Sequence, residues 1–222
     1  LLVFLRPLGL RLLPRILMAA LLGGALSLSG FLLQTFFSNP IAGPFVLGIS
    51  SGAKMVVALT MIVYLKYIGR FSSYTLILAA FIGSLISTGF ILLMSKKVQH
   101  MASLLVGGIM IGYICSAATD FIVTFADDSN IVNLHNWSRG SFSGMTWDNV
   151  KVMSIVVAVT FLMVILLAKP LEAYQLGETY AQNLGVNIRT LRILLVVLSS
   201  VLSACIVAFA GPISFVGIAV PQ

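Results

Sequence analysis

The feature that most limits the possible folds is a long stretch without any charged side chain, residues 16–53. As one helix it would be about 57 Å long at 1.5 Å per residue, whereas the hydrocarbon core of a membrane is about 30 Å thick. The stretch must therefore break, and the Pro- and Gly-containing segment 38–44 favours a turn. We expect a first span over residues 15–37 and a second over residues 45–65.

Further apolar stretches along the chain are long enough to cross a membrane. Short polar or basic segments separate them, and the longest polar interval covers residues 127–150. The remaining spans are expected at residues 74–94, 102–126, 152–168 and 191–210, with the start of a seventh after Gly211-Pro212.

Composition supports a lipid environment. Hydrophobic residues make up 59% of the 222 residues and charged residues only 9%, whereas soluble domains carry about 25% charged residues. A soluble core of this size could not bury so much apolar surface. We therefore predict an all-α fold, a polytopic transmembrane helical bundle with about six or seven spans.

Charge and reactive residues exclude several other classes. The formal net charge of +7 suggests anionic lipid headgroups or acidic partner surfaces, because no basic patch interleaved with aromatics supports nucleic-acid binding. Cys115 and Cys205 lie within apolar runs and are expected to be small buried residues. No phosphate-binding loop, paired acid–base residues or metal-ligand spacing is present, so no enzyme or metal site is expected.

A polar segment, residues 169–192, lies between two apolar runs and has a helical pattern of its own. Residues 178–184 can form about two helical turns, with Tyr180 and Leu184 on one face. Gly185 then supplies the left-handed residue that ends a helix.

A second helix should follow directly, because Asn187 is a good N-cap for a helix that starts at Ile188. The segment is thus expected to form a helix, a glycine break and a helix at a membrane surface. A surface element of this kind could be gripped by a soluble partner, and the alternative is an ordinary connecting loop.

Small residues recur at four-residue spacing along the apolar runs. In lipid this spacing lets helix backbones approach closely, so we favour helix packing over a pore-lining role. The pairs are Ala20 and Gly24, Gly23 and Ser27, and Gly108 and Gly112.

Successive connections between the spans fall on opposite sides of the membrane, and the basic residues are divided almost evenly between these two sides. The positive-inside rule gives a weak preference for a cytoplasmic amino end. One side carries seven (Arg6, Arg11, Arg15, Lys66, Arg70, Arg139 and Lys151) and the other five (Lys96, Lys97, Lys169, Arg189 and Arg192).

Three motifs in order resemble one family. Residues 11–53, RLLPRILMAALLGGALSLSGFLLQTFFSNPIAGPFVLGISSGA, resemble the second and third spans of FecCD-type permeases. These are type II ABC importers for iron-siderophore, haem and cobalamin complexes. Residues 176–192, LGETYAQNLGVNIRTLR, look like the family's coupling segment, and residues 210–222, AGPISFVGIAVPQ, like the stretch after it.

The resemblance implies a ten-span permease in the bacterial cell membrane, with two copies per transporter, two ATPase subunits and an extracytoplasmic substrate-binding protein. Residues 1–222 would be a single permease domain, truncated at both ends, with residues 169–192 as its cytoplasmic coupling segment. The family topology places Arg15 outside, against the count of basic residues. No cofactor is expected in this chain, since ATP and Mg would belong to the ATPase.

The expected function is that of a permease subunit translocating a ferric siderophore, ahead of haem and cobalamin, by alternating access. The alternative is an ion-coupled secondary transporter or channel, which would be expected to carry intramembrane acidic residues. Here only Asp120 is a candidate, and it is expected to be shallow.

Two arginines are candidates for docking the binding protein. Arg15 occupies the second arginine of the family's docking motif, which pairs with glutamates on that partner. Leu12 stands where the first arginine would be, and Arg11 lies one residue earlier, which is a rotation of about 100° on a helix. The alternative for both arginines is anchoring to lipid headgroups.

Residues of the polar segment are candidates for contact with the ATPase, because force can reach the spans only through a short rigid element joined to them. Glu178 has a helix-capping alternative, since it suits the positive end of the helix dipole. The coupling candidates are Leu176, Gly177, Glu178, Tyr180, Leu184 and Gly185.

Candidates for the translocation path lie elsewhere. His100, Met101 and Ala102 match the family's inner gate, where an apolar constriction can close a path, and the alternative is an ordinary surface turn. Lys54 and Asp120 depart from the family. Their depths differ by about 14 Å, beyond the reach of a lysine stem of about 6 Å, so no ion pair is expected.

Lys54 is instead expected to face a water-filled path and meet an anionic ferric chelate, with Asp120 near the outer surface. Gln222 replaces the family's usual histidine and receives no role.

Overall fold

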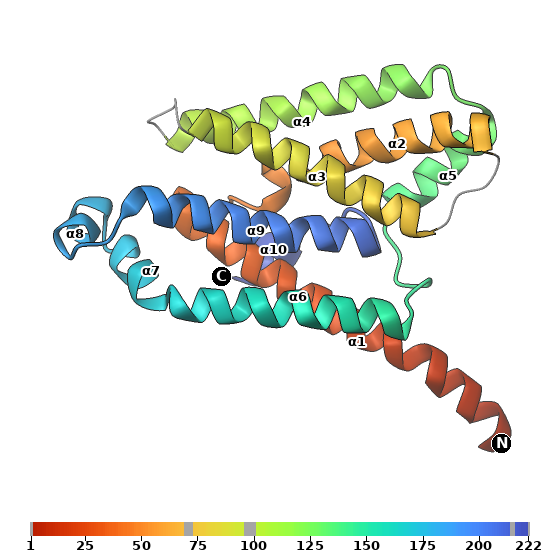
Figure 1. Ribbon diagram of the computed structural model, residues 1–222, viewed down its shortest axis with the longest axis horizontal. Helices are drawn as coiled ribbons and strands as arrows, with labels where there is room; N and C mark the ends of the chain where they lie inside the picture. The colour runs from red at the N-terminus through yellow and green to blue at the C-terminus, as the bar shows by residue number, and fades with distance from the viewer. Residues whose placement is uncertain (1, 69–72, 96–100, 214–215, 222) are drawn as a thin grey trace.

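The computed structural model describes residues 2–68, 73–95, 101–213 and 216–221. These residues form helices and connecting turns with no β-strand (Figure 1). Five of the helices are long and apolar enough to cross a membrane, and α2 adds a shorter apolar stretch. The elements are α1 (Leu2–Phe37), η1 (Pro44–Leu47), α2 (Ile49–Ile68), α3 (Ser73–Ser95), α4 (Met101–Val123), α5 (Asp128–Ser138), α6 (Trp147–Leu166), α7 (Ala168–Gln175), α8 (Glu178–Asn183), α9 (Ile188–Ala210) and α10 (Val216–Ala219).

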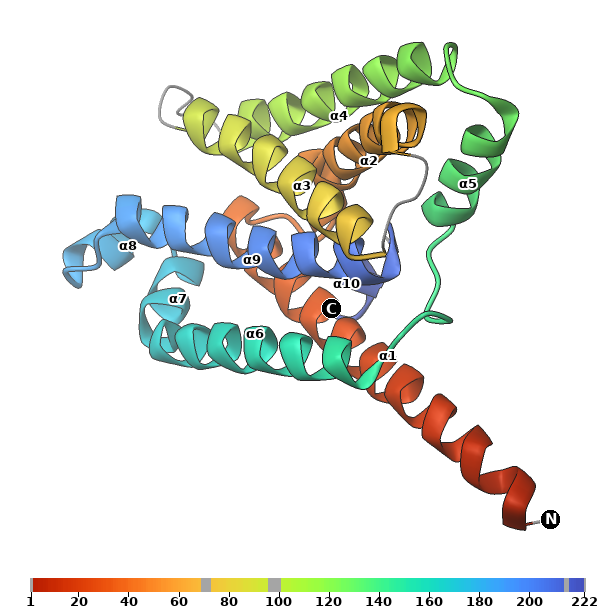
Figure 2. The ribbon, with the colours of Figure 1, turned by 45° about the vertical axis from the view of Figure 1, so that its right-hand side comes forward.

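The all-α bundle expected from the sequence is thus confirmed, and the chain is a multi-pass membrane protein. The long helices run roughly side by side, and α7 and α8 lie at the end of the bundle opposite the N-terminus (Figures 1 and 2). Helices α1, α3 and α6 run towards that end, while α4 and α9 run away from it.

Helix α9 is the centre of the bundle. Within its apolar window 72% of the residues are buried, against 22% for both α4 and α6. Its contact with α1 contains hydroxyls as well as apolar side chains: Ser29 Oγ lies 2.8 Å from Ser199 Oγ and 2.7 Å from Ser203 Oγ. Buried hydroxyls that bond to one another help two helices associate in an apolar environment.

The chain breaks between α1 and α2, as the sequence predicts, but the second span starts later than residue 45. The short helix η1 comes first, and Gly48 with φ 71° then redirects the chain into α2. Only glycine suits this position, because an added Cβ would lie 2.8 Å from the Gly112 nitrogen and 3.1 Å from the Gly108 oxygen.

This contact confirms a packing role for Gly108 and Gly112. Gly23 and Gly24 differ, because an added Cβ at either would meet nothing within 4 Å. The tightest glycine contacts between long helices join α2 and α3: a Cβ at Gly52 would lie 1.9 Å from Ser87 Oγ, and a Cβ at Gly83 would lie 2.3 Å from the Gly52 oxygen.

Two short helices were missed in the polar intervals. Helix α5 occupies part of the interval 127–150, and α7 precedes the helix expected from residue 178. The start of a seventh span is represented in the described residues by α10, which has four residues and packs against α1.

Candidate functional site

Helix α8 starts at the residue expected from the sequence and ends one residue earlier than expected, with Leu184 as its C-cap. It covers Glu178–Asn183, with Gly177 at φ 123° before it and Gly185 at φ 83° after it. The chain reverses there through a hydrogen bond from the Val186 nitrogen to the Ala181 oxygen, 3.0 Å long. The predicted helix, glycine break and helix are therefore confirmed.

Asn187 starts α9 as predicted. Its side-chain Oδ1 accepts a hydrogen bond of 3.1 Å from the Thr190 nitrogen, which satisfies one of the free N–H groups of the first turn. No break separates this turn from the span, so the polar segment leads directly into the most buried helix of the bundle.

Three exposed side chains of this segment are apolar or aromatic although the segment itself is polar. Leu176, Tyr180 and Leu184 are exposed by 71%, 49% and 61%, while Ala181 is fully buried against the bundle. Such side chains at a helix surface form a contact area for another protein or for lipid headgroups. We call Leu176, Tyr180 and Leu184 the α8 surface.

The carboxylate of Glu178 points back towards the bundle. Its Oε1 accepts from an Arg192 guanidinium nitrogen and, at 3.0 Å, from the Tyr174 hydroxyl. No side chain caps the start of α8. The structure therefore shows an ion pair for Glu178, although its position at the first residue of α8 still suits the helix dipole.

Tyr174 joins this group to α1. Its hydroxyl lies 3.2 Å from the Phe36 carbonyl oxygen, and the ring is buried. Burial is the largest influence on the Tyr174 pKa and raises it, Arg192 acts in the lowering direction, and Glu178 raises it further. The hydroxyl therefore stays protonated and able to donate at neutral pH.

A second link to α1 comes from Gln175, whose side-chain nitrogen donates to Thr35 Oγ1 at 3.3 Å. Tyr174, Gln175 and Arg192 were missed as functional candidates by sequence reasoning. Their partners lie on α1 or across the chain reversal at Gly185, and local pattern gives no signal for such contacts.

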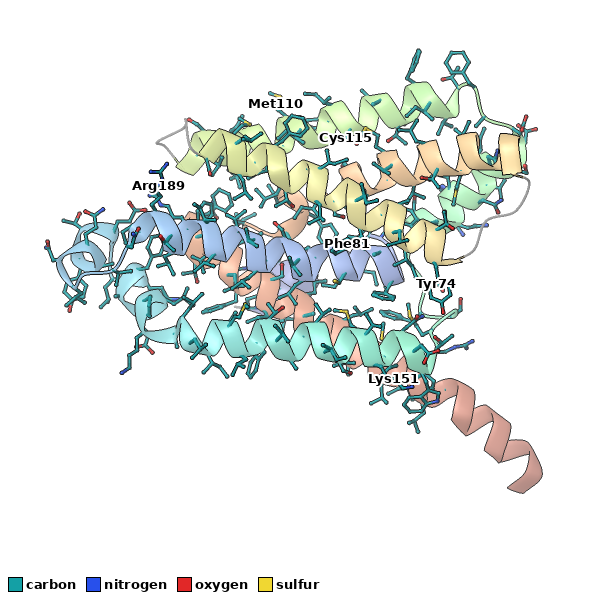
Figure 3. The ribbon with its side chains drawn as sticks, viewed as in Figure 1. Tyr74, Phe81, Met110, Cys115, Lys151 and Arg189 are labelled. Atoms are coloured by element: carbon teal, nitrogen blue, oxygen red, sulfur yellow. The ribbon has the colours of Figure 1, made fainter. Side chains whose placement is uncertain are left out.

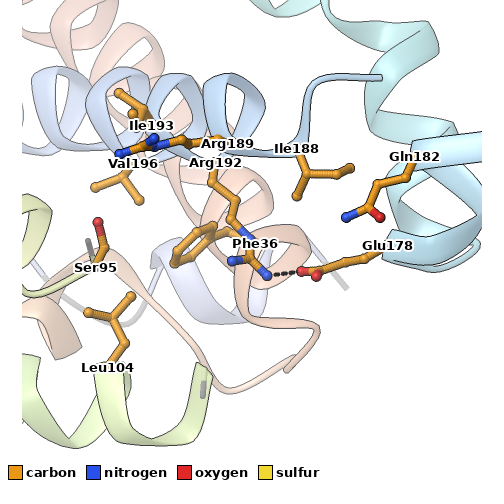
Figure 4. Close-up of a pocket in the computed structure, with 10 residues that line it drawn as sticks. All are labelled: Phe36, Ser95, Leu104, Glu178, Gln182, Ile188, Arg189, Arg192, Ile193 and Val196. Carbon is orange, nitrogen blue, oxygen red and sulfur yellow. Dashed lines mark hydrogen bonds and ion pairs between the residues drawn. The ribbon is translucent and has the colours of Figure 1, made fainter. Parts of the chain in front are cut away.

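A pocket of about 270 Å³ lies between this segment and the neighbouring ends of α1, α3 and α4 (Figure 4). The close-up shows the Arg192 guanidinium directed at Glu178 across one side of it. Its lining brings the last turn of α3 and the first turn of α4 next to α8. The lining residues are Phe36, Ser95, Leu104, Glu178, Gln182, Ile188, Arg189, Arg192, Ile193 and Val196.

Two of the three gate candidates belong to the first turn of α4. His100 lies outside the described residues, Met101 is described only as the first residue of α4, and Ala102 is exposed in the first turn of α4. The first turn of α4 lies at the same end of the bundle as α8 (Figure 1).

The docking candidates lie towards the opposite end. Arg15 is half-buried on α1, and its Nε is buried with no hydrogen-bond partner in the described part of the chain. Arg11 lies in the same helix, so the rotation of about 100° from the matching position applies to it. Its side chain lies outside the described residues. In Figure 3 the labelled Lys151, in the first turn of α6, lies at the N-terminal end of the bundle, and the labelled Arg189, in the first turn of α9, lies at the end that carries α8.

Lys54 and Asp120 are not brought together. Lys54 is half-buried on α2 and Asp120 is exposed near the end of α4. Among the described residues the ion pairs are Lys151 with Asp148 and Arg192 with Glu178. The expected absence of a Lys54–Asp120 pair thus agrees with the structure.

Cys115 and Cys205 are buried and free, as expected. No group of three or more potential metal-ligating His, Cys, Asp or Glu side chains occurs in the described ranges.

Comparison with known proteins gives one consistent result. The model of the FecCD transport family matches residues 8–222. The chain is 37% identical over 211 residues to the hemin transport system permease protein HmuU of Yersinia pestis, a match that covers 95% of this chain and 63% of that protein. It is 38% identical over 212 residues to the vitamin B12 import system permease protein BtuC of Vibrio parahaemolyticus, covering 95% and 62%.

A solved structure shares the fold. It is described as an inward-facing conformation of a metal-chelate type ABC transporter and matches with a TM-score of 0.83 at 30% identity. The match covers 93% of this chain and 65% of that one. The chain thus spans a little under two thirds of the length of the relatives it matches.

Proposed function

The chain belongs to the FecCD transport family, and on that premise we propose that it is a permease subunit of an ATP-driven importer. It moves a metal chelate across the cell membrane by alternating access, while a separate chain hydrolyses ATP. The observation that carries this proposal is the polar α7–α8 element, which presents an apolar surface and joins the central helix α9 without a break.

The α8 surface is the proposed contact for the ATPase. It lies at the end of the bundle opposite the N-terminal arginines, so one end can meet an ATPase while the other meets a binding protein (Figure 1). Leu176, Tyr180 and Leu184 supply the apolar contact, and Gly177 and Gly185 set the ends of the helix. Helices offered in this way suit a groove on a partner.

Arg15 is the proposed docking residue for an extracytoplasmic binding protein, with Arg11 as a second candidate. An arginine suits a partner carboxylate because its planar guanidinium can make two parallel hydrogen bonds. A second permease copy completes the translocation path, in which Lys54, His100, Met101 and Ala102 are the proposed path and gate residues.

The proposed cargo is a metal chelate, with a ferric siderophore as the expectation from the sequence. The named relatives point to haem and vitamin B12 in their own cases. Lys54 favours an anionic chelate, because it is half-buried and belongs to neither of the ion pairs found among the described residues. Binding assays on the partner binding protein with all three cargoes separate them.

Transport in vesicles tests the function. The permease is reconstituted with its ATPase and binding protein, and uptake of haemin, cyanocobalamin and ferrichrome is measured with ATP or a non-hydrolysable analogue. We expect uptake of one chelate that requires hydrolysable ATP and continues when ion gradients are collapsed. Uptake that follows an ion gradient without ATP would identify a secondary transporter instead.

A further inference from the structure

A cluster of side chains around the Glu178 carboxylate connects four helices. It accepts from Arg192 of α9 and from the Tyr174 hydroxyl of α7, and it is itself the first residue of α8. The same hydroxyl also lies within hydrogen-bond distance of the carbonyl oxygen of Phe36, in the last turn of α1, so its one proton is donated to either acceptor or shared between the two. We call the side chains of Tyr174, Glu178 and Arg192, with the Phe36 carbonyl, the Glu178 clasp.

Helix α8 has few other constraints on its orientation. It has six residues, of which only Ala181 is buried, and it lies between Gly177 and Gly185. Both glycines have positive φ, and a Cβ at either would meet nothing within 4 Å. A helix this short is not stable alone, and glycine gives its flanks conformational freedom. Without a lateral tie, α8 could pivot between its two flanks.

We propose that Arg192 and Tyr174 are positioning residues that lock α8 to α9 and to the end of α1. A displacement of the α8 surface would then move both spans together instead of turning α8 about its glycines. This inference rests on the proposed function in one respect, that α8 receives motion from an ATPase. Beyond the proposed function, this inference names the side chains that pass the motion on, Arg192 and Tyr174, and the spans that receive it, α9 and α1.

The exposure of the Arg192–Glu178 ion pair to water indicates that the pair orients α8 and contributes little to the stability of the whole fold. The side chains of Arg192 and Glu178 are 30% and 41% exposed. Ion pairs accessible to water contribute little to global stability, because solvent screens them and ordering the side chains opposes them. Removing the pair should therefore leave the fold intact and change the orientation of α8.

Spin labelling tests the orientation directly. In the assembled transporter in lipid nanodiscs, Cys115 and Cys205 are replaced by alanine and a nitroxide is attached through Asn183→Cys, an exposed position on α8. We expect Arg192→Ala to increase the fast-motion component of the spectrum clearly. Lys169→Ala, an exposed change of the same charge on α7, should leave the spectrum unchanged. An identical spectrum for Arg192→Ala would overturn the proposal.

Coupling is measured in the same transporter as cargo moved per ATP hydrolysed, with the chelate that the wild-type chain takes up. Arg192→Ala and Glu178→Ala should lower this ratio by about fivefold or more, while thermal stability stays near wild type. Glu172→Ala, an exposed acidic position on α7, should keep the ratio.

A charge exchange gives the rescue. The double variant Glu178→Arg with Arg192→Glu should recover a large part of the lost coupling, since it restores an ion pair between α8 and α9. Wild-type coupling in the single variants, or no recovery in the exchange, would contradict the clasp.

Failure of the proposed function would give a different result. The wild-type transporter would then show no ATP-dependent uptake of any chelate, while the nitroxide comparison would still report whether the clasp holds α8.

Discussion

Helices α6 and α9 both join the α7–α8 segment, but they occupy different environments. Only 22% of the apolar window of α6 is buried, against 72% for α9. The Glu178 clasp ties α8 to α9 and α1, and no side-chain hydrogen bond from α8 to α6 occurs in the described part of the chain. In the proposed function, motion at α8 would therefore be delivered to the central helix, while α6 would follow at the periphery.

The largest effect is expected from adding volume to the central helix. Ala204 on α9 is fully buried, so Ala204→Leu should lower the free energy of unfolding by about 3 kcal/mol through overpacking. Ala158→Leu is the matched change at an exposed position on α6 and should stay within about 0.5 kcal/mol.

Exposure of the buried thiols Cys115 and Cys205 on heating, followed with a thiol-reactive dye, measures both variants. Equal losses of stability in the two would remove the distinction between a central and a peripheral helix.

A smaller effect is expected where two helices meet at glycine. A Cβ at Gly83 would lie 2.3 Å from the Gly52 oxygen, so Gly83→Ala should cost about 2 kcal/mol by separating α2 and α3. Gly89→Ala on the same helix is the control, because a Cβ there meets nothing within 4 Å. The same thermal assay compares the two, and a neutral Gly83→Ala would argue against tight α2–α3 packing.

At the N-terminal end, Arg15→Glu should weaken association with the binding protein about tenfold, or about 1.4 kcal/mol, because it places like charges together. Membrane insertion and thermal stability should not change. Titration of the reconstituted permease with the binding protein measures this, and unchanged affinity would assign Arg15 to headgroup anchoring.

The smallest effect is expected at Tyr174. Tyr174→Phe removes the hydroxyl that reaches Phe36 and Glu178 and should cost about 1 kcal/mol of stability. Burial raises the Tyr174 pKa above its ordinary value near 10. A raised pKa means that this contribution is present below about pH 10 and is lost only as the pH rises through the folded-state value.

The penalty of Tyr174→Phe should therefore be constant between about pH 6 and pH 9, measured as the difference in melting temperature at each pH. A penalty that disappears within that interval would show that another group controls the contact.

Much of the fold could be predicted because its signals are local. Apolar runs long enough to cross a membrane predicted the spans. Gly185 predicted where α8 ends, and Asn187 predicted where α9 starts. Helix α7 was not predicted, although Pro170 is compatible with it. This proline lies in the first turn, where its missing N–H removes no helical hydrogen bond.

The candidate site was predicted in part for the same reason. Helical spacing placed Tyr180 and Leu184 together, and both are exposed. The partners of Glu178 could not be predicted, because Arg192 lies beyond a chain reversal and Phe36 belongs to a distant helix.

The central claim is that motion enters this protein through the α8 surface, and Tyr180→Asp tests it most directly. ATP hydrolysis and chelate uptake are measured together in vesicles that contain the complete transporter, with Lys169→Asp on α7 as the control for added acidic charge. The account predicts that Tyr180→Asp retains ATP hydrolysis but loses most of the uptake per ATP, whereas the control stays near wild type. Wild-type uptake per ATP in Tyr180→Asp would contradict it.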